Sequence, residues 1–406
     1  MRIKIFISML ICVLAINAFS QKINQHSKRN YLIVLSLDAF RWDYPQLYST
    51  PNLDSLARIG TKAESLIPSF PTKTFPNHYS IATGLYPDHH GIINNIFYHK
   101  ELDQIYSPSN RKAVENPSFY NGEPAWVTAE KNGIVSGSYY FVGSETPIEQ
   151  IQPTYWKKYD ASIPFSSRAD SVISWLQKPD SLRPHFITFY SEEPDATSHA
   201  YGPKSAETKE IVERLDSLIG DFCRKKNQLP IADSINFIIV SDHGMGPISK
   251  DKAVILSSLL PDYWYKTCLG SNPFFLIEPN KLYRDSVFQT LSAQEGIFVW
   301  KKSEVPAEYH YGSNPNIPEF VVCAKPEWSV YANEGEAVNG GTHGYTPDFT
   351  AMNAIFYGSG PDFKRGFVHR PFKNIELYNL ICKLLNIEPA PNDGKLTNVI
   401  DLLNKK

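Results

Sequence analysis

The sequence predicts an α/β fold in which a central, mostly parallel β-sheet lies between two layers of helices. Three short runs of almost continuous apolar residues, at 32–37, 186–190 and 237–240, are typical of strands that are covered on both faces. Between the second and third runs, apolar residues recur at helical spacing over 207–226, which predicts a covering helix. Because strand-like and helix-like segments alternate through most of the chain, one large α/β domain is favoured over a string of modules.

The chain begins with the features of a secretory signal peptide. Arg2 and Lys4 precede an apolar stretch at 5–18, and small residues near Ser20 form a cleavage pattern. The stretch is shorter than the ~20 residues that a helix needs to cross a bilayer. Cys12 lacks the small residues expected before a lipid-modified cysteine. We therefore expect cleavage, a mature chain without a transmembrane segment, and export to a periplasm or the extracellular medium.

Two segments complete the predicted architecture. Toward the carboxyl end, 352–357 reads as a further strand and 375–385 as a helix. The intervening stretch from about 250 to 340 is rich in Pro, Tyr and Trp with weak periodicity, which indicates an inserted α+β lobe or cap. The predicted organisation is a signal peptide at 1–20 followed by one domain at 21–406, within which the lobe is inserted.

The charge balance and the cysteines exclude some classes of protein. The formal net charge is −2 at pH 7 and becomes −4 when Arg2 and Lys4 are removed, which provides no electrostatic surface for nucleic-acid duplexes or anionic membranes. The wide spacing of the remaining cysteines excludes a zinc finger, whereas export makes disulfides possible in three pairings. A chain of this length can bury a full core without them. These cysteines are Cys223, Cys268, Cys323 and Cys382.

Acidic residues follow each of the three predicted strands. Asp38 follows the first strand, Asp195 comes shortly after the second, and Asp242 follows the third. Ligands of open α/β sheets bind beyond the carboxyl ends of the strands. We therefore expect these side chains to converge on one site.

Histidines add a second type of metal ligand near these acids. His199 follows Asp195 by four residues, so that both can face one ion. Each residue by itself is more often a helix cap or a hydrogen-bonded loop residue, so the prediction rests on their joint occurrence. Clustered carboxylates repel one another unless cations are present, and a pair of divalent cations supplies that charge. The six candidate ligands, three for each ion, are Asp38, Asp195, His199, Asp242, His243 and His343.

A candidate nucleophile lies in the segment 70–78. Thr74 stands just before Pro76 and an apolar-periodic stretch, at the place where a helix N-cap belongs. The free N–H groups and positive potential of a helix N-terminus favour both a threonine alkoxide and a bound phosphoryl group. A capping threonine is usually only a cap. Nearby metal ligands strengthen the nucleophile hypothesis, because metal coordination is a recognised way to activate a hydroxyl group.

The order and spacing of these motifs resemble the nucleotide pyrophosphatase/phosphodiesterase family of the alkaline phosphatase superfamily. The resemblance extends over nearly all of the mature chain and rests on the motifs at 35–38, 71–78, 84–92, 193–199, 241–245 and 343–345. It implies an alkaline phosphatase-like three-layer α/β/α domain. It also implies an exported enzyme with two zinc ions that cleaves phosphodiester or pyrophosphate bonds of nucleotides. The reaction would release nucleoside 5′-monophosphates through a covalent phosphothreonine.

The resemblance further implies roles for individual residues. Asn95 would donate to a phosphate oxygen, with the adjacent Asn94 as the alternative, and Thr74 would bridge toward the second zinc ion. The residues implied for the first zinc ion are Asp195, His199 and His343, and those for the second are Asp38, Asp242 and His243. The residues implied for the nucleobase slot are Phe75, Tyr159 and Tyr190.

Two departures from the family pattern concern the surroundings of the ligands. Ser198 stands where the family usually has a glycine before the histidine ligand. Thr346 and Pro347 separate Tyr345 from Asp348, whereas an aspartate commonly follows that tyrosine directly. Neither departure removes a ligand, but both leave the local backbone and the phosphate side of the site less defined.

The type of bond cleaved follows from the cationic residues. A monoester carries an extra negative charge and needs more cationic partners, such as the Lys or Arg pairs of related monoesterases. The stretch 137–142 contains no Lys-x-Arg pair, and Lys73 is expected to be solvated or structural rather than catalytic. Diesters and anhydrides of nucleotides are therefore favoured.

Alternative functions remain on the same fold. Aromatic cages also hold quaternary ammonium groups, so a phosphodiesterase of choline-containing lipid head groups is one alternative, and a phosphomonoesterase is another. A non-catalytic binding protein is the third, although all six ligand positions and Thr74 are present. We expect the protein to be a monomer.

Overall fold

The main body of the protein is built on one eight-stranded sheet. The structure is a computed structural model that describes residues 30–405, so the predicted signal peptide at 1–20 lies outside the described residues. Strand β18 runs antiparallel to both of its neighbours, and the other pairs in the sheet are parallel. The predicted mostly parallel sheet is therefore confirmed. In spatial order the strands are β19 (Phe367–His369), β2 (Thr61–Ala63), β18 (Phe356–Ser359), β9 (Ile235–Val240), β1 (Tyr31–Leu37), β8 (Phe186–Ser191), β6 (Ser136–Tyr139) and β7 (Tyr155–Lys157).

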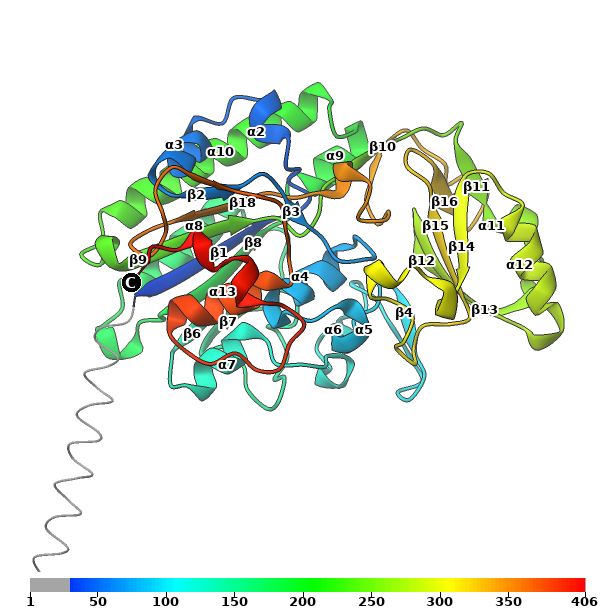
Figure 1. Cartoon of the computed structure of the whole chain (residues 1–406), viewed down its shortest axis with the longest axis horizontal. Helices are drawn as coiled ribbons and strands as arrows, with labels where there is room; N and C mark the ends of the chain where they lie inside the picture. The colour runs from blue at the N-terminus through cyan, green and yellow to red at the C-terminus, as the bar shows by residue number, and fades with distance from the viewer. Residues whose placement is uncertain (1–29, 406) are drawn as a thin grey trace, which may run out of the picture.

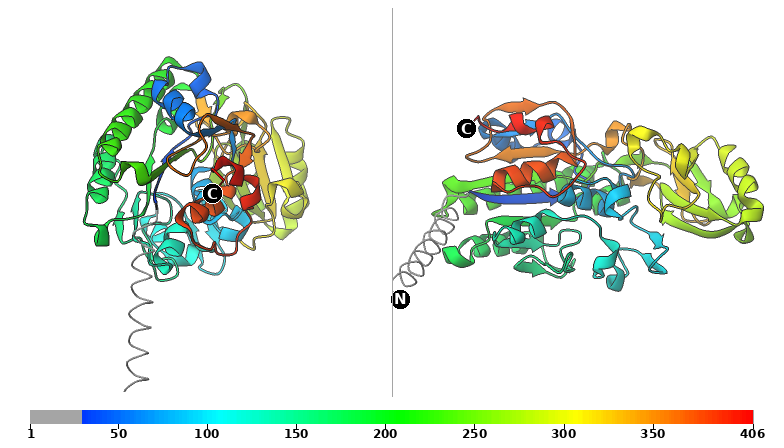
Figure 2. Two further views of the ribbon diagram at one scale, coloured as in Figure 1. Left: turned by 60° about the vertical axis from the view of Figure 1, so that its left-hand side comes forward. Right: turned by 60° about the horizontal axis from the view of Figure 1, so that its bottom comes forward.

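Helices cover both faces of this sheet (Figures 1 and 2). The central strand β1 is buried throughout, and its side chains alternate between the two layers. Ile33 and Leu35 belong to one core cluster, and Leu32 and Val34 to the other. The helices that contribute side chains to the cluster of Ile33 and Leu35 are α3 (Pro51–Ile59), α8 (Phe165–Leu176) and α10 (Ala206–Asn227). The helices that contribute to the cluster of Leu32 and Val34 are α4 (Thr74–Thr83), α7 (Ala125–Lys131) and α13 (Glu376–Leu385).

The prediction of a strand over 352–357 is wrong in its position. β18 begins only at Phe356, because the preceding residues form a 3-10 turn over Thr350–Met352. The carbonyl oxygen of Met352 accepts a hydrogen bond from the N–H of Gly244 at 2.7 Å, so this backbone supports a loop of the site rather than the sheet. The other predicted strands and helices lie within about two residues of the observed ones, the usual uncertainty of such boundaries.

A second, smaller sheet lies beside the main body, at the right of Figure 1. Its four strands are antiparallel, and it has its own apolar core with α12 (Arg284–Ser292). Four free thiols, at Cys223, Cys268, Cys323 and Cys382, are present in the described chain. The strands, in spatial order, are β12 (Tyr265–Ser271), β13 (Phe274–Pro279), β15 (Phe320–Ala324) and β14 (Ile297–Lys301).

The remaining elements that the structure describes are short. Among the described residues, no helix has the length and apolar character needed to cross a membrane. The paired strands are β3 (Leu66–Ile67) with β20 (Phe372–Lys373), β4 (Phe97–His99) with β5 (Gln104–Tyr106), β10 (Gly246–Ile248) with β17 (Gly340–Thr342), and β11 (Ala253–Ile255) with β16 (Ser329–Tyr331). The short helices are α2 (Tyr44–Leu47), α5 (Pro87–His90), α6 (Arg111–Val114), α9 (Asp195–Tyr201) and α11 (Leu256–Leu259).

Candidate active site

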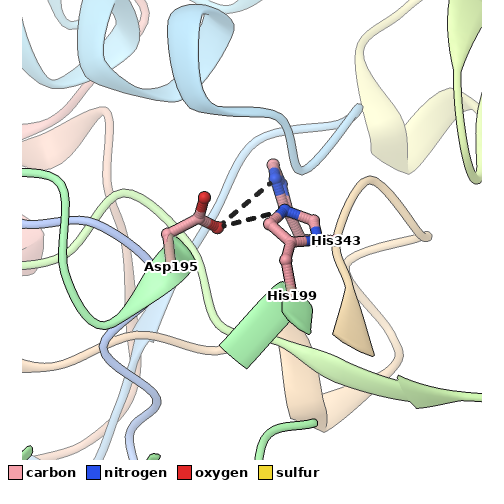
Figure 3. A group of neighbouring side chains, drawn as sticks. All are labelled: Asp195, His199 and His343. Carbon is pink, nitrogen blue, oxygen red and sulfur yellow. Dashed lines mark ion pairs between the residues drawn. The ribbon is translucent and has the colours of Figure 1, made fainter. Parts of the chain in front are cut away.

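The carboxyl ends of three neighbouring strands meet at one edge of the main sheet. Asp38 follows β1, Asp242 follows β9, and Asp195 opens α9 shortly after β8. Since β1 pairs in parallel register with both β8 and β9, these strands end side by side. The groups whose ligand-type atoms lie within 4.8 Å of one another are Asp195, His199 and His343 (Figure 3); Asp38, Asp195 and His243; and Asp38, His78 and Asp242.

Three histidines present the same ring nitrogen to this edge. In each ring Nδ1 lies against a backbone carbonyl oxygen: Gly341 for His199, Gly244 for His243 and Thr72 for His343, at 2.8, 2.9 and 2.9 Å. A carbonyl oxygen only accepts, so the hydrogen-bond network assigns the proton to Nδ1. The lone pair of Nε2 is then available to the site. This is the usual arrangement of metal-binding histidines, whose other nitrogen donates to the protein.

The carboxylates of the site carry buried oxygens without hydrogen-bond partners. Within residues 30–405 these oxygens are Asp38 Oδ1, Asp195 Oδ1 and Asp242 Oδ2. Each lies 3.0–3.6 Å from an Nε2 atom of the three histidines. Burial, with the charges of Asp242 and Asp195, raises the pKa of Asp38 well above its usual range. Such a cluster is costly unless cations compensate it, and imidazole nitrogens with carboxylate oxygens are ligands that zinc prefers.

Thr74 lies at the start of α4 and directs its hydroxyl group toward this cluster. The distance from Thr74 Oγ1 to His243 Nε2 is 3.1 Å. The helix begins at Thr74 itself, and Lys73 occupies the N-cap position, one residue earlier than the sequence predicted. Asn77 holds this start in place because its Nδ2 donates to the carbonyl oxygens of Pro71 and Lys73 at 3.0 and 2.9 Å. Thr74 therefore combines a helix N-terminus with a nearby unprotonated imidazole nitrogen.

Asn95 and Asn94 occupy different environments. The Oδ1 atom of Asn95 accepts a hydrogen bond from the backbone N–H of Phe75 at 2.9 Å, so Asn95 reaches the first turn of α4. Asn94 is fully buried, and its side chain binds the backbone of Asn95 and Ile96. Only Asn95 is thus positioned beside Thr74. Its hydrogen bond also occupies the backbone N–H of Phe75.

The three aromatic residues predicted for a base slot lie around the same edge. The hydroxyl group of Tyr190 donates to Asp38 Oδ2 at 2.6 Å. Tyr159 is 39 % exposed, and its ring lies 5.1 Å from that of Tyr140. Phe75 packs edge to face against Tyr106. The structure describes all three residues, and their rings do not contact one another. The space between them is therefore not filled by packing of these rings.

Lys73 is buried and makes a structural contact. The sequence predicts a solvated or a structural side chain, and the structure shows the second. Lys73 is 2 % exposed, and its Nζ donates to the carbonyl oxygen of Asn272 at 2.7 Å. The contact joins the start of α4 to the turn between β12 and β13. Gly344, at φ +121°, allows this path, because a Cβ atom there would lie 2.5 Å from Lys73 Cε.

The two departures from the family pattern leave the ligand cluster intact. Ser198 is buried and faces away from the cluster, with its Oγ 3.4 Å from the hydroxyl group of Tyr44. The hydroxyl group of Tyr345 donates to the carbonyl oxygen of Trp328, and Asp348 accepts a hydrogen bond from Tyr309. These three side chains therefore serve packing between elements.

Sequence reasoning missed His78, which lies against Asp242. It occurs four residues after Thr74, a spacing that puts two residues on one face of a helix. That spacing and the place of His78 at the end of the motif 71–78 are signals in the sequence, but the spacing also suits an ordinary core histidine.

Comparison with known proteins finds a matching family model and several related sequences. The model of the family "type I phosphodiesterase / nucleotide pyrophosphatase" matches residues 32–346. Rat ectonucleotide pyrophosphatase/phosphodiesterase family member 3 is 35% identical over 92% of this chain and 44% of its own length. Human member 1 is 37% identical over 89% of this chain and 40% of its own length. A venom phosphodiesterase of Crotalus durissus collilineatus is 36% identical over 89% of this chain and 45% of its own length. The chain thus spans less than half the length of these curated relatives.

Solved structures share the whole fold. Murine ectonucleotide pyrophosphatase/phosphodiesterase 5 has a TM-score of 0.88 and 31% identity, and the match covers 92% of this chain and 100% of that one. A threonine-to-alanine variant of the murine protein, described as inactive and in complex with AMP, has a TM-score of 0.89 at 30% identity, and the match covers 93% of this chain and 100% of that one. The alkaline phosphatase-like fold expected from the sequence is confirmed.

Proposed function

The chain belongs to the type I phosphodiesterase/nucleotide pyrophosphatase family, and we propose that it hydrolyses phosphodiester and pyrophosphate bonds of nucleotides to release nucleoside 5′-monophosphates. One observation carries the proposal. The hydroxyl group of Thr74 lies 3.1 Å from His243 Nε2, at a helix N-terminus and beside buried carboxylates that need cations. This combination suits a hydroxyl nucleophile that attacks phosphorus.

Two zinc ions fit the donor set, because it combines three available imidazole nitrogens with three carboxylates. When bound, such a pair supplies Lewis-acid stabilisation of the attacking and leaving oxygens. The residues proposed to hold the first ion are Asp195, His199 and His343. Those proposed for the second are Asp38, Asp242 and His243, with Thr74 next to them.

Thr74 is the proposed covalent catalyst. Its oxygen forms a bond to phosphorus as the leaving oxygen departs, which gives a phosphothreonine, and water then cleaves that ester to return the free hydroxyl group. The N-terminus of α4 stabilises the negative charge of the phosphoryl group. Asn95 is held beside Thr74 through the N–H of Phe75, which leaves its Nδ2 donor for a phosphate oxygen.

Phe75, Tyr159 and Tyr190 are the proposed nucleotide-binding residues. A base can stack on exposed aromatic faces, and the 39 % exposure of Tyr159 suits such a role. The hydroxyl group of Tyr190 donates to Asp38, a proposed ligand of the second zinc ion. Tyr190 therefore serves the metal site as well as the substrate.

A substrate panel tests the proposal. Zinc-loaded protein is compared on equal concentrations of a 4-nitrophenyl ester of a nucleoside 5′-phosphate, a dinucleoside polyphosphate, glycerophosphocholine and 4-nitrophenyl phosphate. We expect the two nucleotide substrates to be cleaved to nucleoside 5′-monophosphate and the monoester to react at least about tenfold more slowly, because the site lacks additional cations. Faster cleavage of glycerophosphocholine or of the monoester would contradict the proposal. Failure to cleave any of them would favour a binding protein.

Tyr159→Ala is expected to weaken nucleotide binding specifically. Loss of one stacking partner costs about 1–3 kcal/mol, which raises KM for the nucleotide ester by roughly 5- to 150-fold. Methyl 4-nitrophenyl phosphate has no base to stack, so its kcat/KM is expected to stay the same. Tyr263→Ala, at an exposed tyrosine of the small-sheet region, is the matched control. Equal losses on both substrates would show that Tyr159 has no role in base binding.

Export is proposed from the relatives and from the start of the sequence. The relatives are named as ecto-enzymes and as a venom enzyme. The first twenty residues have the pattern of a secretory signal peptide. Amino-terminal sequencing of protein collected outside the cytoplasm is expected to begin near residue 21, and an intact leader would contradict this.

A further inference from the structure

His78 differs from the three histidines of the ligand cluster because the protein occupies both of its ring nitrogens. Its Nε2 lies 2.9 Å from Ser36 Oγ on β1. Its Nδ1 lies 3.0 Å from the carbonyl oxygen of Thr74 and 3.3 Å from Asp242 Oδ2. The His78 and Asp242 side chains are both fully buried. His78 therefore touches a helix turn, a strand and a carboxylate at once.

The protonation of His78 follows from these partners. Both oxygens that face Nδ1 only accept, so the hydrogen-bond network assigns a proton to Nδ1, which donates to the Thr74 carbonyl oxygen and lies 3.3 Å from Asp242 Oδ2. Ser36 can donate, so Nε2 accepts its hydroxyl proton. Both ring nitrogens thus have partners within the protein, and neither is left for a metal ion.

Packing fixes the ring in this orientation. It meets the rings of Phe141 and Tyr190 edge to face, both at 5.2 Å between centroids. Tyr190 in turn donates to Asp38, so the contacts of His78 extend to both carboxylates of the second predicted metal site. Rotation of the ring would break the bond to Ser36 and expose a cavity, which is costly in a close-packed core.

The Asp242 carboxylate depends on His78 at one particular oxygen. Oδ1 is held by the backbone N–H of Ala39 at 3.2 Å and by the hydroxyl group of Ser241 at 3.3 Å. Oδ2 lacks a hydrogen-bond partner among the described residues and lies 3.3 Å from His78 Nδ1 and 3.0 Å from His243 Nε2. His243 faces the site, so His78 is the neighbour that approaches Oδ2 from the protein side.

We propose that His78 is a positioning residue: its Nδ1–H donates to the Thr74 carbonyl oxygen and faces Asp242 Oδ2, so the ring sets the separation between the first turn of α4 and Asp242 and thereby aligns Thr74 with the second metal site. The inference rests on the proposed function of that site. Outer partners of metal ligands tune affinity, and their loss typically costs about 10–100-fold. The effect is confined to one site, because within residues 30–405 His78 contacts residues of β1, α4 and the second metal site and does not contact Asp195, His199 or His343.

Zinc binding by three variants tests this role. The Asn amide nitrogen can take the place of Nδ1, the Gln amide reaches the place of Nε2, and Leu removes both polar atoms. Each protein is loaded with zinc alone and titrated with a chromophoric chelator. For His78→Leu and His78→Gln we expect the affinity of one ion to fall about 10–100-fold and that of the other to stay unchanged. His78→Asn should stay within a few-fold of the parent protein for both.

Kinetics and a matched buried histidine separate positioning from general stability. His90 is also fully buried and binds Ser80 and the carbonyl oxygen of Pro76, without contact to the ligand cluster. His90→Leu is expected to lower the unfolding midpoint without changing zinc affinity. At saturating zinc, His78→Leu should lower kcat at least about tenfold with KM nearly unchanged, because Thr74 is misaligned.

Several outcomes would overturn the inference. These are unchanged zinc affinity in His78→Leu, equal loss of both ions, or identical behaviour of His78→Asn and His78→Gln. If His78→Leu does not fold, the comparison of zinc affinity between His78→Asn and His78→Gln tests the positioning role. Zinc binding does not require turnover, so selective loss of one ion without nucleotide cleavage would support the positioning role and contradict the proposed function. Nucleotide cleavage that does not change when His78 is replaced would support the proposed function and contradict the positioning role.

Discussion

Thr74→Ala is expected to lower kcat/KM for a nucleotide phosphodiester by at least about 1000-fold, because removal of a covalent nucleophile leaves only binding and electrostatic stabilisation. The side chain is small, lies at the first position of α4 and makes its hydrogen bond to His243 alone. Alanine is a good helix former, so the fold is expected to survive the change.

The measurement pairs activity with binding. Thr74→Ala should still bind AMP and zinc, and Thr74→Ser, which retains the hydroxyl group, should keep far more activity than alanine. Acid quenching of the parent protein during turnover of a phosphorus-labelled substrate should trap label on Thr74. A loss of less than tenfold on Thr74→Ala, or label on another residue, would show that Thr74 is not the nucleophile.

Removal of metal is expected to have an effect of similar size. Dialysis against a strong chelator should reduce phosphodiesterase activity to below about 1% of the starting value, because two ions stabilise both reacting oxygens in such sites. Stoichiometric zinc should restore it, at about two ions per chain by elemental analysis. Magnesium alone should not, because it prefers an all-oxygen octahedral shell, whereas this cluster offers three imidazole nitrogens.

Metal binding should also be visible without turnover. One buried oxygen each of Asp38, Asp195 and Asp242 (Oδ1, Oδ1 and Oδ2) has no hydrogen-bond partner among the described residues, so the metal-free protein bears the cost of their proximity. Addition of zinc should therefore raise the midpoint of thermal unfolding as its concentration exceeds the dissociation constant. Activity that survives exhaustive chelation, with no change in the unfolding midpoint, would exclude the proposed two-metal site.

Features that depend on local sequence were predictable. Continuous apolar runs identified β1, β8 and β9, and the acids that follow them fell at one sheet edge because parallel strands end together. The start of α4 was predicted to within one residue, since the Thr-Phe-Pro segment suits a helix N-terminus. The strand near 352–357 was misplaced because its apolar residues pair with a loop of the site before they reach the sheet.

The sequence by itself determined the fold class, the acids and histidines available to the site, and the threonine at a helix start, because periodicity and turn chemistry are properties of neighbouring residues. Only the tertiary structure decided how those residues are oriented. The Nε2 atoms of His343 and His199 face the site because Nδ1 is bound by carbonyl oxygens that are 271 and 142 residues away in the chain. The distinct role of His78 has the same physical origin. Its spacing from Thr74 is ordinary for a helix, and only packing against β1 and Asp242 determines what its two nitrogens bind.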